Sequence, residues 1–342
     1  MYIYCVYLFS ADVFSHVWNE VDKIGNDTEA AQVRHMVVAA KAPATVSQYH
    51  RLFLRWRAFA IHKGIPDIPA TKAGLALFIN TIRLTHNSRS LIDSSRSAIA
   101  WAHHMLGFSN PFDDPWIKNI LEGAKRLIVQ GAPCTKKPVD LDLIKSVISN
   151  TDFNNLKSLR ATTMIVLLFC GFLRISEVLN IKCSDLSFSP THLIVKICSS
   201  KTDQLRRGND VTISASSLPT CPVNIVSKYL TLAKLNLSSH EYLFRALSFK
   251  KSGCYVLTTK NKPICYSTAR EVILSCIKPF TSDISEYGTH SFRRGGATLA
   301  SDQGVDHRLL MGHGRWQSTK AKDMYVVDSV EKKCSVSFSL GL

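Results

Sequence analysis

A short segment rich in proline, glycine and lysine divides this chain of 342 residues into two stretches of different character. The segment reads Gln-Gly-Ala-Pro-Cys-Thr-Lys-Lys-Pro over residues 130–138. Pro133 and Pro138 disfavour helix in the residues that precede them, so this part of the chain is expected to be extended. We therefore predict a linker over residues 131–139 with a folded domain on each side. The chain is long enough for two hydrophobic cores.

The stretch before the linker has the apolar spacing of a small helical bundle. A first helix is expected to begin near residue 44, and further helices are expected over Thr71–Leu84, Ser88–Leu106 and Asp114–Val129. We predict an N-terminal extension over residues 1–29 and a helical domain over residues 30–130. In the first helix, apolar side chains recur at three- and four-residue steps and form one buried stripe, made of Val46, Tyr49, Phe53, Trp56 and Ala60.

Several basic residues of this stretch lie away from the apolar stripe. Taken alone, Arg51 and Arg55 fit a solvated helix surface best, but in a strongly basic chain they are candidate DNA-binding residues. Lys136 and Lys137 of the linker are candidates of the same kind. The adjacent His103 and His104 are expected on a helix surface or in a groove rather than as metal ligands.

The stretch after the linker predicts a second domain over residues 140–330 and a tail over residues 331–342. Two short segments have strand composition, and the polar segment between them, which contains Lys201, is expected at the tip of a hairpin. The fold class is therefore mainly α with a small antiparallel β-sheet. Helices are expected over Asp140–Ser149, Ser158–Cys170, Asn224–Lys234, Tyr266–Lys278, Thr289–Ser301, Val305–Met311 and Thr319–Val326, and strands over Thr191–Cys198 and Asp210–Ser214.

The charge of the chain favours a polyanionic partner. Lys and Arg number 42 and Asp and Glu 26, which gives a net charge of +16. Residues 1–29 hold one base and five acids, a net of −4, so residues 30–342 carry +20. Such a surplus points first to nucleic acid. The first nine residues are apolar but too short to cross a bilayer, which takes about 20 residues. We expect an intracellular protein with no membrane partner.

The cysteines and histidines give no sign of a metal site. The ten cysteines include no Cys-x-x-Cys pair, and no histidine stands at zinc-finger spacing from them. Scattered cysteines in a chain without a signal peptide are expected to be reduced. We therefore predict neither a metal nor another cofactor.

Six residues of the second stretch suit phosphodiester chemistry without metal. A tyrosine can attack phosphorus and keep the bond energy in a covalent ester. Guanidinium groups bind the non-bridging oxygens in pairs and stay charged, while histidine and lysine can handle protons. The tryptophan can donate its indole N–H to a phosphate oxygen. The six residues are Arg174, Lys201, His290, Arg293, Trp316 and Tyr325.

The local spacing of these residues supports one shared site. His290 and Arg293 stand three apart, hence on one face of a helix, with Thr289 as the expected N-cap. Arg174 follows Gly171, which is expected to break the preceding helix, and it opens the next helix, which holds Glu177. Gly295 and Gly296 would allow close backbone packing behind the histidine and arginine.

These motifs resemble those of the tyrosine recombinase family, which includes the phage integrases and Cre recombinase. The resemblance spans roughly residues 30–330. It implies that Arg174 and Arg293 bind the phosphate and that Lys201, on its hairpin, is the general acid. It also implies that His290 is the histidine of a His-x-x-Arg motif.

The remaining positions of the family motif are also filled. The resemblance implies that Tyr325 is the nucleophile and that Glu177 supports the active site. Trp316 lies nine residues before Tyr325, where the family has His or Trp. His313 lies twelve residues before it and is the second choice for that role. The tripeptide Gly314-Arg315-Trp316 resembles the corresponding sequence in recombinases of eukaryotic mobile elements.

The resemblance implies a site-specific recombinase or integrase that acts on double-stranded DNA. Its two domains, a core-binding domain and a catalytic domain, would form a clamp around the duplex. The protein would be a monomer when free and a homotetramer on DNA, with the tail docked into a neighbouring protomer. Strands would be exchanged through a Holliday junction, in the nucleus of a eukaryote or the cytoplasm of a prokaryote. Two alternatives stay open: a type IB topoisomerase, and a domesticated DNA-binding protein without recombination.

Overall fold

The computed structural model describes residues 15–129, 135–198 and 208–341. The chain divides into two compact units, Met1–Pro133 (unit 1) and Cys134–Leu342 (unit 2). Each unit contains a hydrophobic core of its own. Among the described residues, no helix is both long enough and apolar enough to cross a membrane. The described cysteines form no disulfide.

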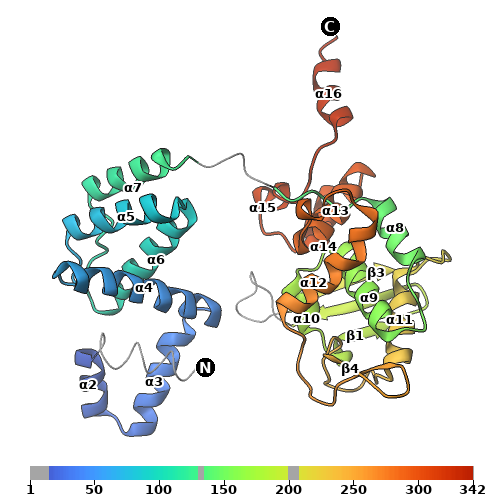
Figure 1. The fold of residues 1–342 in the computed structure, drawn as a ribbon, viewed down its shortest axis with the longest axis horizontal. Coiled ribbons are helices and arrows are strands. Elements are labelled where there is room, and N and C mark those ends of the chain that lie inside the picture. Colours follow the sequence, from blue (N-terminus) through green and yellow to red (C-terminus); the bar gives the residue numbers. More distant parts are fainter. Residues whose placement is uncertain (1–14, 130–134, 199–207, 342) are drawn as a thin grey trace. The chain divides into compact units, whose positions relative to one another are not determined.

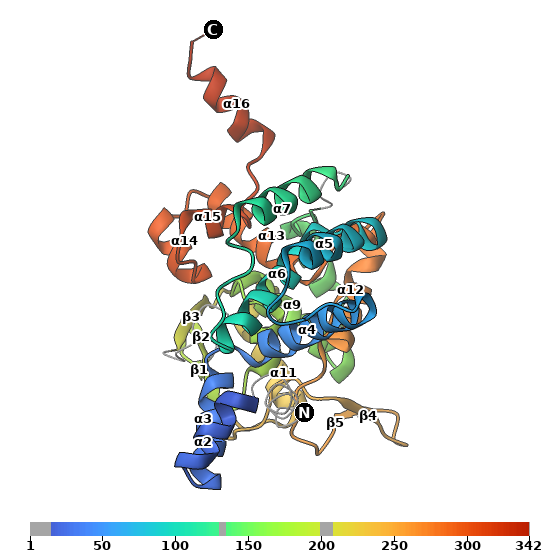
Figure 2. The same ribbon diagram turned by 90° about the vertical axis from the view of Figure 1, so that its left-hand side faces the viewer.

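All regular elements described in unit 1 are helices (Figure 1). Helix α4 packs along α6, and α5 packs along α7. Figure 2 shows α2 and α3 at the end of the unit opposite to α7. The predicted boundary between residues 29 and 30 falls inside α3. The helices are α2 (Ser15–Ile24), α3 (Asp27–Ala39), α4 (Pro43–Lys63), α5 (Lys72–His86), α6 (Arg89–Met105) and α7 (Pro115–Leu127).

The apolar stripe of α4 forms the centre of the unit 1 core, as its spacing predicts. Phe53 and Trp56 are completely covered, and the Trp56 ring packs against Phe78 of α5 at 5.3 Å between centroids. The three later helices begin at residues whose side chains accept hydrogen bonds from the first-turn N–H groups, which would otherwise lack partners. These capping residues are Thr71, Ser88 and Asp114.

His103 is a core residue of unit 1, so the expectation of a surface or groove position was wrong for it. Its exposed fraction is 1%. The ring can be buried because both nitrogens are bonded to backbone: Nδ1 donates to the Ile99 carbonyl at 2.7 Å, and Nε2 accepts from the Ala70 N–H at 2.9 Å. Burial lowers the pKa of His103, which keeps the ring neutral. His104 is exposed, as expected.

Unit 2 combines helices with two small antiparallel sheets, which confirms the predicted fold class. One sheet has the order β1-β2-β3, and β4 pairs with β5 in the other. Helices are α8 (Leu141–Ser149), α9 (Leu156–Cys170), α10 (Ile175–Asn180), α11 (Pro222–Ala233), α12 (Tyr266–Ile277), α13 (Thr289–Asp302), α14 (His307–Gly314), α15 (Thr319–Asp323) and α16 (Val330–Phe338). Strands are β1 (Leu186–Phe188), β2 (His192–Ile197), β3 (Asn209–Ser214), β4 (Leu247–Phe249) and β5 (Tyr255–Leu257), and 3-10 turns are η1 (Cys183–Asp185), η2 (Lys278–Phe280) and η3 (Ile284–Glu286).

Helix α9 is the central element of unit 2. Leu156 and every residue from Leu159 to Phe169 are buried, including the polar residues Arg160, Thr162 and Thr163. Helices α8, α11, α12 and α13 pack around it (Figure 1). The turn that follows α9 leads directly to Arg174.

The end of the predicted linker packs on unit 2. The Val139 N–H donates to the Ser291 carbonyl at 3.0 Å. A Cβ atom at position 295 would lie 1.9 Å from the Val139 carbonyl oxygen, and one at position 296 would lie 2.2 Å from the Phe169 carbonyl oxygen. Only glycine allows α13 to approach both segments so closely. The expected role of Gly295 and Gly296 is thus confirmed.

Four of the described strands and α-helices of unit 2 were not predicted from the sequence: strands β1, β4 and β5 and helix α16. The short strands have too few residues to show a clear period. Strands β2 and β3 pair from His192↔Ser214 to Ile197↔Asn209, which confirms the two predicted strands.

Candidate active site

The described candidate catalytic residues come from three segments of unit 2: the turn between α9 and α10, helix α13, and the segment from Trp316 to Tyr325. The first is the turn between α9 and α10, where Arg174 is the N-cap of α10. Phe172 in this turn has a φ of 46°, in the left-handed region. A Cβ atom at Gly171 would lie 2.9 Å from the Leu167 carbonyl oxygen, so glycine lets the chain turn there. The helix break predicted at Gly171 is confirmed.

Glu177 binds two arginines from different parts of the chain. Its side chain is 1% exposed, and Oε1 accepts from Nη1 of Arg174 at 2.6 Å while Oε2 accepts from Nη2 of Arg315 at 2.7 Å. Oε2 also accepts from the Arg174 N–H at 2.8 Å. Burial alone would raise the pKa of Glu177, but the charge of Arg315 and the hydrogen bonds from Arg174 outweigh it and hold the pKa below its usual value. The carboxylate is therefore ionised and fixed.

Arg293 lies fully buried at the centre of the site. Its Nη1 donates to the Phe172 carbonyl and its Nη2 to the Gly314 carbonyl at 2.6 Å. Its guanidinium lies 4.8 Å from the ring centroid of Trp316 and 4.8 Å from that of Tyr325, within cation–π range. Burial lowers the pKa of Arg293 to about 10, and the positive charges of neighbouring arginines add to this effect. The guanidinium still carries its charge at neutral pH.

Three rings surround this guanidinium on one side. The ring centroids of Trp316 and Tyr325 are 5.5 Å apart, and those of His290 and Tyr325 are 6.1 Å apart. Tyr325 is half-buried, and its carbonyl accepts from the Thr298 hydroxyl of α13 at 3.4 Å. The structure thus brings together Arg174, His290, Arg293, Trp316 and Tyr325, which the sequence analysis had grouped.

Two details of this region differ from expectation. The N-cap of α13 is Gly288 rather than Thr289, because the Ser291 hydroxyl accepts from the Gly288 N–H at 3.0 Å and Thr289 is the first helical residue. Helix α15 ends at Asp323 instead of Val326. Tyr325 therefore follows the helix.

Trp316 has a buried hydrogen-bond donor without a partner. The residue is 7% exposed, and its Nε1 forms no hydrogen bond within the described part of the chain. Leaving a buried N–H unpaired costs about 1–3 kcal/mol. Such a donor at the edge of a site is ready for an acceptor on a ligand.

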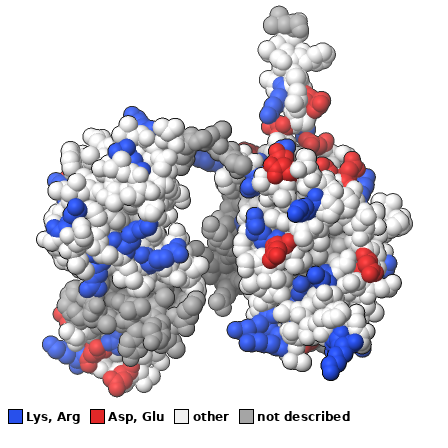
Figure 3. Space-filling view, viewed as in Figure 1, with Lys and Arg blue, Asp and Glu red and all other residues white. Residues whose placement is uncertain are grey.

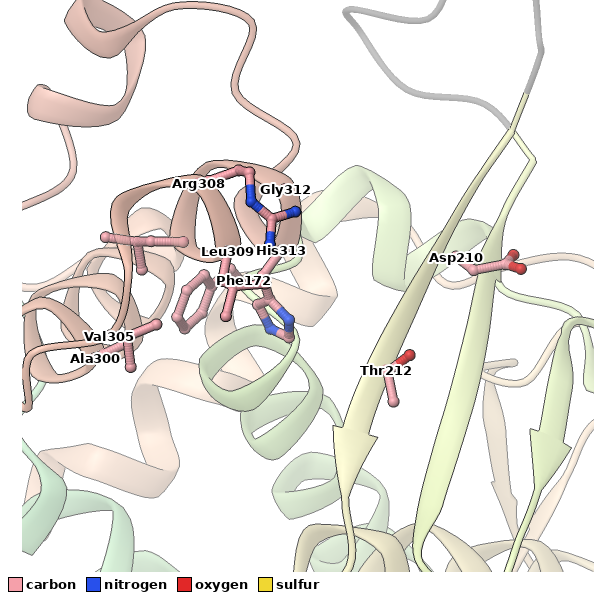
Figure 4. A pocket seen from close by; sticks show the side chains of 10 residues that line it. Phe172, Asp210, Thr212, Ala300, Val305, Arg308, Leu309, Gly312 and His313 are labelled. Carbon is pink, nitrogen blue, oxygen red and sulfur yellow. The ribbon is translucent and has the colours of Figure 1, made fainter.

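His313 contacts the end of α9 and the turn that follows it. Its Nε2 donates to the Cys170 carbonyl at 2.8 Å, and its ring packs edge-on against Phe172, with centroids 4.6 Å apart. Figure 4 shows its ring beside Phe172 in a pocket next to α14. Burial lowers the pKa of His313, which favours a neutral ring. His313 thus ties α14 to the end of α9.

Lys201 lies outside the described residues. The flanking strands end at Ile197 and Asn209, which pair with each other.

The four candidate DNA-binding residues have different surroundings. Arg51 and Arg55 are exposed on α4, and an Arg55 Nη2 lies 3.0 Å from His86 Nε2. Lys136 and Lys137 are engaged within unit 2: Lys136 donates to the Ser285 carbonyl, and Lys137 pairs with Glu286 at 2.6 Å. On the face drawn in Figure 3, the acidic side chains of unit 1 gather at its α2–α3 end.

Sequence reasoning did not identify Arg315. It is 8% exposed and forms the second ion pair of Glu177. An arginine between glycine and tryptophan has no sequence signal that separates a buried from a solvated side chain. The described residues contain no group of three or more His, Cys, Asp and Glu side chains that could hold a metal ion.

Known proteins resemble this chain over most of its length. The model of the phage integrase family matches residues 140–331. The integrase/recombinase XerD homolog of Selenomonas ruminantium is 25% identical over 309 residues, which are 88% of this chain and 86% of the relative. This bacterial relative gives no support to the resemblance to eukaryotic mobile elements.

Two solved structures share the fold. The XerH site-specific recombinase bound to palindromic difH substrate, in a post-cleavage complex, has a TM-score of 0.57 at 15% identity and covers 86% of this chain and 77% of its own. The Tn1549 transposon integrase in complex with transposon right end DNA also has a TM-score of 0.57, at 13% identity, and covers 92% and 98%. The chain therefore belongs to the phage integrase family of tyrosine recombinases, enzymes that cleave and rejoin DNA.

Proposed function

We propose that this chain is a site-specific recombinase that cuts DNA through a covalent tyrosyl ester. The Tyr325 hydroxyl gives up its proton, with His290 as the proposed acceptor, its oxygen attacks the phosphorus, and the bond from phosphorus to the 5′-oxygen breaks. The DNA 3′ end stays on Tyr325, and Lys201 gives a proton to the departing 5′-oxygen. A 5′-hydroxyl of a second strand reverses the step, which exchanges strands through a Holliday junction.

The position of Arg293 against both Trp316 and Tyr325 is the observation that carries this proposal. A guanidinium 4.8 Å from each ring places positive charge next to the proposed nucleophile. Arg174 is the N-cap of α10 and follows the turn whose Phe172 carbonyl accepts from Arg293. Trp316 adds an unpaired N–H donor. Phosphate oxygens are suitable acceptors for all three groups, and such charge stabilisation lowers the barrier for phosphoryl transfer. His290, exposed beside the Tyr325 ring, is placed to exchange protons with bulk water or substrate.

DNA binding is proposed for both units. The net charge of +16 favours contact with the phosphate backbone. In unit 1 we assign Arg51 and Arg55 of α4 to this contact because their side chains are exposed. In unit 2, Lys136 and Lys137 keep their protein partners in the absence of DNA and would need to exchange them for phosphate. The likeness to structures with bound DNA supports the same substrate class.

Assembly of four protomers on DNA is proposed through helix α16. Its residues include no buried side chain, and Val336, Phe338 and Leu340 are 69%, 86% and 69% exposed. A pocket of about 510 Å³ lies among α13, α14 and β3 (Figure 4). Its apolar lining includes Phe172, Ala300, Val305 and Leu309. We propose that this pocket receives apolar side chains of the tail from a neighbouring protomer, because Val336, Phe338 and Leu340 stay exposed on their own unit although Lys332 of α16 contacts Ser301 and Asp302.

A suicide substrate tests the cleavage step. A duplex nicked close to the cleavage site releases a short 5′-hydroxyl fragment by diffusion, so the covalent adduct accumulates. We expect a protein–DNA adduct resistant to denaturant and formed in the presence of EDTA. The target duplex would first be selected from a random library by binding. Absence of an adduct on bound DNA would leave only a DNA-binding protein, while relaxation of supercoiled plasmid without strand exchange would indicate a topoisomerase.

A further inference from the structure

Arg315 has a backbone conformation that arginine does not favour. It follows the last residue of α14 with φ 55° and ψ 39°, in the left-handed region. Glycine usually occupies this position after a helix because a Cβ atom is strained there. Strained residues of this kind persist when surrounding contacts hold them, and they are found often at functional sites.

The Arg315 side chain has contacts that hold it in this conformation. Its Nη2 lies 2.7 Å from Glu177 Oε2 and 3.3 Å from the Phe172 carbonyl, and its Nη1 lies 3.1 Å from the His313 carbonyl. Arg293 donates to the same Phe172 carbonyl. One backbone oxygen in the α9–α10 turn therefore orients two guanidinium groups. Phe172 is itself a left-handed residue, with a φ of 46°.

Arg315 also determines which oxygen of the Glu177 carboxylate is left to pair with the Arg174 guanidinium. Oε2 of the carboxylate accepts from Nη2 of Arg315 and from the Arg174 backbone N–H, and Oε1 accepts from Nη1 of Arg174. A carboxylate can accept both N–H groups of one arginine fork. If Arg315 were absent, Glu177 could turn and bind Arg174 in that bidentate way, which would withdraw N–H donors that the phosphate needs.

The left-handed turn at Arg315 also determines where the Trp316 side chain lies. The Trp316 ring lies over Gly314, where a Cβ atom would be 2.0 Å from the indole. From this position the indole reaches the Arg293 guanidinium and the Tyr325 ring. The backbone and the side chain of Arg315 thus organise opposite sides of the same site.

We propose that Arg315 is a positioning residue for DNA cleavage, which keeps Glu177 from engaging a second N–H of the Arg174 guanidinium and so leaves that donor for the phosphate. This inference rests on the proposed function. It predicts a specific defect: Arg315 variants should lose stabilisation of phosphate charge while they retain the nucleophile. The competing explanation is a buried ion pair that only stabilises the fold.

The test compares cleavage of two suicide substrates by Arg315→Gly and Arg315→Lys. One substrate has the natural phosphodiester, and the other has a neutral methylphosphonate at the cleaved position. Glycine relieves the left-handed strain and Glu177 keeps its ion pair with Arg174, which together offset part of the cost of losing Arg315. The melting temperature of each variant is measured alongside cleavage. Lysine can pair with Glu177 but cannot reach both carbonyls as a fork. Arg174→Ala calibrates the loss of phosphate stabilisation. The matched control is Arg245→Lys, which alters a buried arginine paired with Glu241 at 2.8 Å.

We expect Arg315→Gly to cleave the phosphodiester about 10²-fold more slowly in single turnover, the scale of a misplaced catalytic group. DNA affinity should stay close to that of the wild type, and Arg315→Lys should be intermediate. On the methylphosphonate, Arg315→Gly and Arg174→Ala should both approach the wild-type rate, since no phosphate charge needs stabilisation. Arg245→Lys should cleave both substrates like the wild type.

Two outcomes would overturn the inference. One is wild-type cleavage of the phosphodiester by Arg315→Gly. The other is an equal loss on both substrates that follows a lower melting temperature, which would mean a structural role only. A wild-type protein that forms no adduct at all would instead refute the proposed function, and this inference with it. That case is distinguishable because Arg174→Ala and the wild type would then give the same null result.

Discussion

The Arg315 guanidinium lies 2.7 Å from the Glu177 carboxylate, although 138 residues separate the two in the sequence. Both side chains are almost completely buried, at 4% and 1% exposure. Removing one partner of a buried pair leaves an uncompensated charge, which is strongly destabilising. Here Glu177 faces two cations, so its loss should have a larger effect than the loss of either arginine.

Glu177→Gln should therefore lower the free energy of unfolding by about 3–5 kcal/mol at pH 7, as measured by urea denaturation. The folded-state pKa of Glu177 is below the usual 4.5. Its contribution to stability is therefore complete above pH 4.5 and is lost as the pH falls below that value. The stability difference between wild type and variant should shrink between pH 4.5 and pH 3.

Glu241→Gln is the matched control because Glu241 is 40% exposed and pairs with one arginine. Its effect on stability should be much smaller. An equal effect of the two substitutions would contradict the special position of Glu177.

Unit 1 should lose stability in mild acid through His103. Its folded-state pKa lies below 6.5 because the ring is buried, so the neutral ring stabilises the fold above pH 6.5. As the pH falls below 6.5, protonation removes the acceptor for the Ala70 N–H. Hydrogen exchange of the Ala70 amide should accelerate between pH 6.5 and pH 5, beyond the intrinsic pH effect on exchange.

The exposed neighbour gives the control for this effect. His104→Gln should keep the pH dependence of Ala70 protection, whereas His103→Leu should weaken protection at every pH and remove the dependence. Unchanged behaviour of His103→Leu would assign the effect to another group.

Tyr325→Phe should abolish the covalent adduct while DNA affinity stays nearly unchanged. Only the phenolic oxygen reacts, whereas binding comes from many phosphate contacts. Denaturing gels of the suicide-substrate reaction measure the adduct, and a mobility shift measures affinity. Tyr266→Phe, which alters an exposed tyrosine of α12, should retain the adduct. An adduct from Tyr325→Phe would show that another residue is the nucleophile.

Lys201→Ala should cleave normal DNA about 10²–10⁴-fold more slowly, the usual scale of general acid catalysis. It should recover on a substrate whose bridging 5′-oxygen is replaced by sulfur, because a thiolate leaves without a proton. Single-turnover rates on the two substrates check this.

Arg174→Ala is the comparison, since a group that stabilises phosphate charge should gain nothing from the sulfur substitution. If sulfur fails to rescue Lys201→Ala while chemistry limits the rate, His290 becomes the next candidate for the acid.

Truncation after Val330 should spare the binding of one protomer to a half-site and impair assembly on the full site. The truncation removes the exposed apolar residues of α16. Phe338→Ser and Leu309→Ser should each weaken assembly, because they alter the tail and the proposed pocket respectively. Analytical ultracentrifugation on DNA measures the assembly, with Leu218→Ser, at another exposed leucine, as control. Normal assembly of the truncated protein would refute the role of the tail.

The sequence by itself determined those features that depend on local spacing. The three- and four-residue repeat that contains Phe53 and Trp56 determined the buried face of α4, because a helix brings such positions to one side. His290 and Arg293 could be paired for the same reason, and the ordered motifs indicated the chemistry before any contact was visible.

Only the tertiary structure decided which polar side chains are buried. Arg315 and His103 have ordinary local sequences, yet Arg315 is held by Glu177 and His103 by backbone groups of its own core. Glu177 lies far from Arg315 in the sequence, and the Ala70 N–H that binds His103 lies outside its helix. Whether such a side chain is buried or solvated depends on long-range packing and on the hydrogen bonds that offset its desolvation, and spacing along the chain does not encode these.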